Sequence, residues 1–127
     1  MKKILLVDDS RDLLDFLSRL LRLYNYEVKI ASSKREMEVS LAYYLPDLIL
    51  MDVLLNEEDG KVLCKEIKRT NENVAIILLS ASPELLSNYR DYDADDILEK
   101  PFDLKLITKT IENVLKEKLD VHHDIVF

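Results

Sequence analysis

The chain contains very little glycine, proline and cysteine. Its 127 residues include one glycine, three prolines, one cysteine and no tryptophan. A single glycine cannot build a GxGxxG or similar phosphate-cradling loop, so the common nucleotide-binding motifs are excluded, as is a Gly-rich linker. A single cysteine cannot form an internal disulfide, so the composition predicts a reducing compartment.

Basic charge and long apolar runs are also scarce. The chain has 18 basic and 25 acidic residues and a formal charge of -7, which disfavours direct binding of this domain to nucleic acid or to an anionic membrane. The first apolar run stops at Asp8 and is too short for a signal peptide. No stretch approaches the roughly 20 apolar residues of a membrane span. We therefore expect one soluble, cytoplasmic domain that can bury its own core.

Short apolar segments alternate with segments of helical periodicity along the whole chain. The predicted strands cover residues 4–7, 26–30, 48–51, 74–79 and 97–98. Helical patterns follow them around residues 13–21, 37–44, 63–67, 84–89 and 104–115. This alternation predicts a parallel sheet with helices on both faces. In the strand order 2-1-3-4-5, the ends of strands one, three, four and five are neighbours.

Polar residues follow four of these strands directly. Asp8 and Asp9 come after the first strand, Asp52 after the third, Ser80 after the fourth and Lys100 after the fifth. In open α/β sheets ligands bind beyond the carboxyl ends of the strands, so these side chains are expected to meet. Carboxylates with a Mg²⁺ ion, a lysine and a hydroxyl can stabilise phosphoryl oxygens while one carboxylate acts as the nucleophile. Asp52 is the candidate nucleophile, and it would become an acyl phosphate.

Over residues 2 to about 118 the chain resembles the receiver domain of two-component response regulators. The resemblance rests on the pair Asp8-Asp9, Asp52, Asp59-Gly60, Ser80-Ala81, and Ala94-Asp95-Asp96 before Lys100-Pro101-Phe102. It implies a flavodoxin-like (βα)5 three-layer sandwich, with a parallel five-stranded sheet in the order 2-1-3-4-5. We expect the receiver domain to cover residues 1–119, with 120–127 as a C-terminal tail or the start of a linker to an output domain.

The same resemblance implies a phosphorelay function. A sensor histidine kinase or a phosphotransfer protein would donate a phosphoryl group to Asp52. Lys100 would contact that group and Ser80 would take part in switching. Mg²⁺ would be bound by the acid pair, Asp52 and the backbone carbonyl of Leu54. Such a domain is not a conventional enzyme, because it catalyses only its own phosphorylation and dephosphorylation. It acts through partners or self-association, here with a candidate homodimer through the face of helix 4, strand 5 and helix 5.

Three features depart from the usual pattern of that family. Ile97 stands where an aromatic residue normally swings inward on activation, so that coupling cannot operate unchanged, and we expect Ile97 to pack in the core. Asn56 replaces the usual proline in the loop after the third strand, and Glu57 follows it, which predicts a more mobile and more negative loop. The segment 80–100 is slightly short, which predicts a shortened fourth helix.

Two other functions remain open at this point. A Mg²⁺-dependent phosphohydrolase with an aspartyl nucleophile would need a second acid two residues after Asp52, where Leu54 stands. A receiver-like interaction module that is never phosphorylated is the other alternative. The altered loop and Ile97 allow it, whereas the intact set of polar residues argues against it.

Several of the polar residues also have purely structural interpretations. Asp9 could cap the first helix, Ser80 could be bonded locally, and Lys100 could be a solvated charge. Cys64 lies among apolar residues and is expected in the core. Two segments look like metal sites, but we expect no ligand role for either. His122 and His123 are sequence neighbours, which rarely converge on one ion. Asp91, Asp93, Asp95 and Asp96 lack the glycine and the terminal glutamate of a calcium loop, so we expect a solvated acidic turn there.

Overall fold

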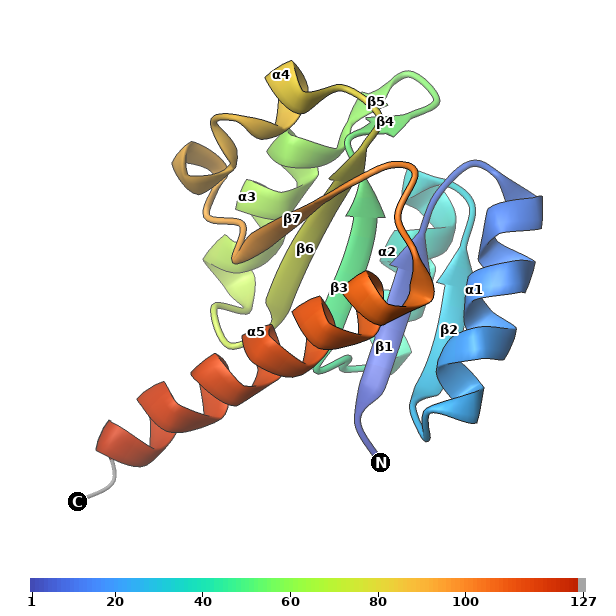
Figure 1. Cartoon of the computed structure of the whole chain (residues 1–127). Helices are drawn as coiled ribbons and strands as arrows, with labels where there is room; N and C mark the ends of the chain where they lie inside the picture. Colours follow the sequence, from blue (N-terminus) through green and yellow to red (C-terminus); the bar gives the residue numbers. More distant parts are fainter. Residues whose placement is uncertain (126–127) are drawn as a thin grey trace.

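A parallel five-stranded sheet lies between two layers of helices (Figure 1). The computed structural model describes residues 1–125, and it describes side chains as far as Leu119. The sheet has the order β2-β1-β3-β6-β7. Its strands are β1 (Lys3–Val7), β2 (Glu27–Ala31), β3 (Leu48–Asp52), β6 (Ala75–Ser80) and β7 (Asp96–Glu99). Two short strands, β4 (Leu54–Leu55) and β5 (Glu58–Asp59), form a separate antiparallel pair. The predicted order 2-1-3-4-5 is confirmed, since the numbering differs only because of β4 and β5.

The helices divide between the two faces of the sheet. Helices α1 (Arg11–Leu23) and α5 (Leu104–Ile125) pack on one face, and α2 (Lys34–Tyr43), α3 (Gly60–Thr70) and α4 (Pro83–Leu86) pack on the other. A 3-10 helix, η1 (Tyr89–Tyr92), connects α4 to β7. Among the described residues, no helix has both the length and the apolar character needed to cross a bilayer.

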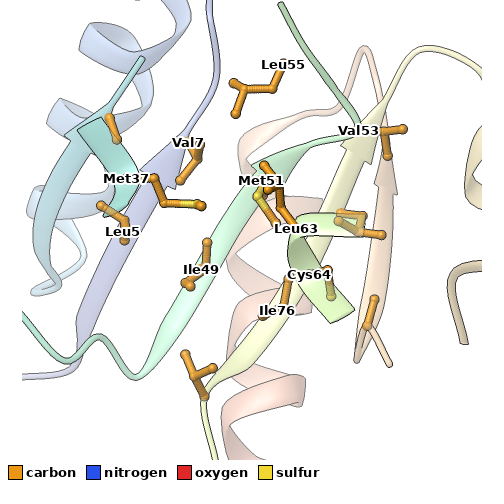
Figure 2. Packing of buried hydrophobic residues seen from close by; sticks show 14 of the residues in the cluster. Leu5, Val7, Met37, Ile49, Met51, Val53, Leu55, Leu63, Cys64 and Ile76 are labelled. Carbon is orange, nitrogen blue, oxygen red and sulfur yellow. The ribbon is translucent and has the colours of Figure 1, made fainter. Parts of the chain in front are cut away.

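The strands are buried on both faces because apolar residues fill both alternating sets. Ile49 and Met51 of β3 belong to the cluster under α2 and α3, whereas Leu48 and Leu50 belong to the cluster under α1 and α5. Figure 2 shows the first cluster, in which Leu63 and Cys64 of α3 lie against Met51 and Ile76. Because all five strands run parallel, their carboxyl ends lie at one rim, and this positions the polar residues.

Cys64 lies in the core, as predicted. Its side chain is fully buried, and burial raises the pKa of the thiol to about 12. Because the thiolate is the reactive form, we expect native Cys64 to react with a disulfide reagent at about pH 8 at least a thousandfold more slowly than in guanidinium. The release of the coloured thiol measures both rates. Comparable rates in the two conditions would contradict this burial.

The fourth helix is short, as the sequence predicted. Helix α4 has four residues, and the chain continues through η1 to Asp93, which adopts a left-handed conformation with a φ of 64°. Ile97 of β7 is half-buried and packs against the core, as expected. At the other end of the chain, α5 continues to Ile125, past the predicted boundary at 119. The division into domain and tail stays a prediction, and the side chains of His122 and His123 lie outside the described residues.

Candidate functional site

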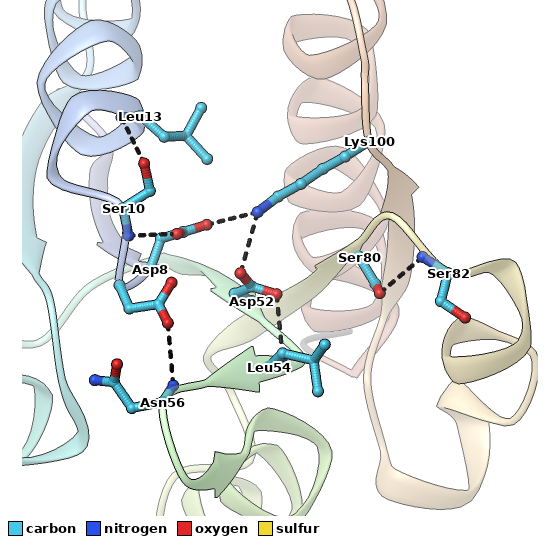
Figure 3. Close-up of polar contacts among 10 residues, drawn as sticks. Asp8, Ser10, Leu13, Asp52, Leu54, Asn56, Ser80, Ser82 and Lys100 are labelled. Atoms are coloured by element: carbon cyan, nitrogen blue, oxygen red, sulfur yellow. Dashed lines mark hydrogen bonds and ion pairs between the residues drawn. The ribbon is translucent and has the colours of Figure 1, made fainter.

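The predicted polar residues come together at the rim formed by the carboxyl ends of the strands (Figure 3). Asp52 and Ser80 are the last residues of β3 and β6, and both strands run in parallel. Asp8 follows β1 directly, and Lys100 follows β7 directly. The topology therefore brings together side chains that are up to 92 positions apart in the sequence.

Lys100 joins two of the carboxylates. Its Nζ donates to Asp8 Oδ2 at 2.8 Å and to Asp52 Oδ2 at 3.1 Å. The side chains are 24% exposed for Lys100, 3% for Asp8 and 11% for Asp52, so solvent screens these contacts only weakly. Burial lowers the pKa of Lys100, but the hydrogen bonds to Asp8 and Asp52 outweigh burial, and the pKa is raised. Lys100 is therefore a fixed positive charge at the rim.

The surroundings of Asp52 disfavour its charged form. Burial raises the pKa of its carboxyl group, and the nearby Asp8 adds to this. The Leu54 N–H, which donates to Asp52 Oδ1 at 3.1 Å, and Lys100 lower the pKa but only partly compensate. A carboxylate whose charge is incompletely balanced will favour a further cation or a reaction that consumes the charge.

The two acids after β1 have different partners. Asp8 Oδ1 accepts from Ser10 N at 2.9 Å, and Asp9 Oδ2 accepts from Asn56 N at 3.2 Å. The cap of α1 is Ser10, whose hydroxyl accepts from Leu13 N. The interpretation of Asp9 as the helix cap is therefore wrong, because the neighbouring serine satisfies the first turn. Asp9 instead fixes the loop after β3 beside the site.

The carboxylates of Asp8, Asp9 and Asp52 fit a divalent cation. Each offers an oxygen, and these oxygens lie within 4.8 Å of one another. Carboxylate oxygens are the ligands that Mg²⁺ prefers, and acids at this spacing, of which Asp8 and Asp52 are buried, repel one another without a cation. Lys100 neutralises only part of this charge, so the donor set and the charge balance both fit Mg²⁺.

Ser80 and Leu54 have positions that leave their predicted roles untested. Ser80 is buried, and its Oγ accepts from Ser82 N at 3.0 Å, which is the local bonding that the structural interpretation anticipates. Among the described residues no hydrogen bond joins Ser80 to Asp52. Leu54 is 59% exposed, and its backbone contacts Asp52 through the N–H.

Two features near Asp52 were not foreseen. The loop after β3 closes as the β4–β5 hairpin, in which Asn56 has a φ of 55°. Gly60, which opens α3, donates to Val53 O at 2.7 Å, and a Cβ atom at Gly60 would overlap the backbone oxygen of Asp52. The available signal in the sequence was that Gly60 is the only glycine in the chain, because glycine is the usual residue where two backbones approach closely.

Comparisons with known proteins agree with this geometry. A family model described as the response regulator receiver domain matches residues 4–112. The uncharacterized transcriptional regulatory protein YvcP of Bacillus subtilis is 36% identical over 118 residues, which cover 91% of this chain and 49% of YvcP. The chain spans about half the length of the curated relatives that it matches.

Solved structures with the same fold are also close to this one. A CheY-like response regulator receiver domain protein from Methanospirillum hungatei superimposes with a TM-score of 0.88 at 26% identity, covering 94% of this chain and 98% of that one. The receiver domain of NtrC4, solved as a beryllofluoride-activated dimer, has a TM-score of 0.85 at 27% identity, covering 93% of this chain and 99% of that one.

Proposed function

Because the chain belongs to the response regulator receiver domain family, we propose that Asp52 accepts a phosphoryl group from the histidine of a sensor kinase or a phosphotransfer protein. The observation that carries the proposal is the placement of the Asp52 carboxylate, 3.1 Å from Lys100 Nζ and within a cluster of three carboxylates. In the transfer, an Asp52 oxygen forms a bond to phosphorus while the bond from phosphorus to the histidine nitrogen breaks.

Each residue of the rim has a proposed task. Mg²⁺, when bound, would balance the charge of the carboxylates and of the phosphoryl oxygens, and Asp8, Asp9, Asp52 and the Leu54 carbonyl would hold it. Lys100 Nζ would give up its hydrogen bond to the Asp52 carboxylate and would contact the negatively charged phosphoryl oxygens instead. For Ser80 we propose a hydrogen bond to the phosphoryl group, formed after the hydrogen bond between Ser82 N and Ser80 Oγ has broken.

The two alternatives are less well supported. The residue two positions after Asp52 is Leu54, so the second acid of an aspartyl phosphohydrolase is missing there. A module that is never phosphorylated would have no need for three carboxylates and Lys100 at one rim, because like charges that lie close together cost stability, above all the buried Asp8 and Asp52.

The proposed context is cytoplasmic signalling through protein contacts. The NtrC4 receiver domain was solved as a beryllofluoride-activated dimer, which supports a proposed homodimer of this domain. The face of α4, β7 and α5 is the face that we propose for it. The name of YvcP refers to transcription. A formal charge of -7 disfavours contact of this domain with DNA, so we propose that any such output belongs to a different part of the protein.

The proposal is tested by incubating the chain with Mg²⁺ and acetyl phosphate and measuring the intact mass. We expect a gain of one phosphoryl group per chain, and we expect EDTA to prevent it because the carboxylates would then repel the donor. Peptide mapping after reduction of the acyl phosphate should place the group on Asp52. No gain in mass with Mg²⁺ present would favour the interaction module instead.

A further inference from the structure

Helix α3 contacts segment 87–95, the stretch that follows the short helix α4. Figure 1 shows α3 beside this segment, which leads through η1 to β7. Three lysines of α3, here called the lysine row, all reach it: Lys61, Lys65 and Lys68. Their spacing of four and three residues places them on one side of the helix.

The far end of the row is a buried ion pair. Lys68 Nζ lies 2.7 Å from Asp95 Oδ2, and the Lys68 side chain is 8% exposed. Asp95 also pairs with Lys118 of α5 at 3.0 Å and accepts from Ile76 N at 2.8 Å. Asp95 was expected to be part of a solvated acidic turn, and this expectation is wrong because its carboxylate joins α3, β6 and α5.

The near end of the row lies beside the phosphoacceptor. Lys61 follows Gly60, whose backbone packs directly against that of Asp52. Lys61 is buried, and its Nζ lies 3.4 Å from Asn88 Oδ1 and 5.2 Å from the centre of the Tyr92 ring. Among the described side chains no carboxylate pairs with it. Lys61 is therefore held by an amide oxygen and an aromatic face and not by a salt bridge.

The middle lysine completes the connection. Lys65 Nζ donates to the backbone oxygen of Asp91 at 3.1 Å, so the row touches the segment at residues 88, 91, 92 and 95. The segment is therefore connected to the site in two indirect ways. It lies downstream of Ser80 along the chain, and the lysine row attaches it to α3, the helix that begins at Gly60.

We propose that the lysine row is a regulatory device that holds segment 87–95 in its resting position and couples it to the state of Asp52. The inference rests on the proposed function of Asp52 as the phosphoacceptor. Phosphorylation shifts the backbone around Asp52 and Gly60, the first turn of α3 moves, and the contacts of Lys61 with Asn88 and Tyr92 are lost. The face of α4, β7 and α5 then changes without an aromatic residue at position 97.

Coupling between two sites is reciprocal, and this makes the device measurable. If the row favours the resting state, weakening it must strengthen binding at the phosphoacceptor. We expect Lys61→Met to tighten the binding of Mg²⁺ with beryllofluoride about fivefold or more, measured by calorimetry. Simple electrostatics predicts the opposite sign, because removing a positive charge weakens the binding of an anion.

The matched control is Lys109→Met, which removes the same charge from an exposed position on α5. We expect it to leave the affinity unchanged or slightly weaker. Lys65→Met should act in the same direction as Lys61→Met, since it breaks another contact of the row. Hydrogen exchange should show faster exchange of the amides of residues 87–95 in both row variants before any ligand is added.

The outcomes separate this inference from the proposed function. If the wild type binds beryllofluoride with Mg²⁺ and Lys61→Met binds it equally or more weakly, the lysine row does not couple to the site, and Asp52 stays the proposed phosphoacceptor. If the wild type does not bind beryllofluoride at all, the proposed function fails and this inference fails with it. Tighter binding together with faster exchange supports the device.

Discussion

Asp52→Asn is expected to take up no phosphoryl group from acetyl phosphate, whereas the wild type takes up one per chain. The amide has no nucleophilic anionic oxygen, so the bond to phosphorus cannot form. Intact mass spectrometry with Mg²⁺ present checks this, and a variant that still gains one phosphoryl group would show that Asp52 is not the acceptor.

The same substitution is expected to raise the free energy of unfolding. The raised pKa means that native Asp52 binds its proton more tightly than in the unfolded chain, so its ionisation costs stability. This cost is absent below the unfolded pKa and grows as the pH rises through the folded pKa. Asparagine removes the charge and keeps an oxygen that can accept from Leu54 N. Lys100 stays paired with Asp8 at 2.8 Å.

Denaturant unfolding at neutral pH measures this gain, and it also shows that the loss of phosphorylation does not come from misfolding. The matched control is Asp15→Asn, an exposed acid on α1, which should leave both phosphorylation and stability unchanged. If Asp52→Asn unfolded more easily than the wild type, the conclusion that the charge of Asp52 destabilises the folded protein would be wrong.

The sequence was sufficient to predict the sheet and the position of Asp52. Strands such as β3 and β6 are buried on both faces, so they read as unbroken apolar runs with a sharp polar end. Once these runs are parallel, geometry alone brings their ends to one rim. For this reason the meeting of Asp8, Asp52 and Lys100 was predictable although they lie far apart in the chain.

The sequence was insufficient where short elements or competing residues decide the structure. The β4–β5 pair has two residues in each strand, which is below the length at which alternation gives a signal. Ser10 and Asp9 are adjacent and both can cap a helix, so only the structure distinguishes them. The partners of Lys61 and Asp95 depend on how α3 packs against segment 87–95. Local sequence patterns do not predict that packing.

Gly60→Ala is expected to destabilise the fold by about 3 kcal/mol and to slow phosphorylation of Asp52 strongly. In an ordinary helix the same change stabilises by up to about 1 kcal/mol, since alanine is the better helix former. Here the new Cβ would overlap the backbone oxygen of Asp52 and would come within 3.0 Å of Val53 Cα. These atoms belong to the backbone, so no side-chain rotation relieves the overlap.

The sign of the effect on stability is therefore the decisive measurement for Gly60. Denaturant unfolding gives that sign, and the rate of mass gain with acetyl phosphate reports the displacement of Asp52. Val62→Ala lies in the same turn of α3 at a site that is 45% exposed, and it should cost less than about 1 kcal/mol and leave the rate unchanged. Equal stability of Gly60→Ala and the wild type would mean that α3 can move away from β3 freely. In that case the first turn of α3 could not transmit a change at Asp52 to Lys61.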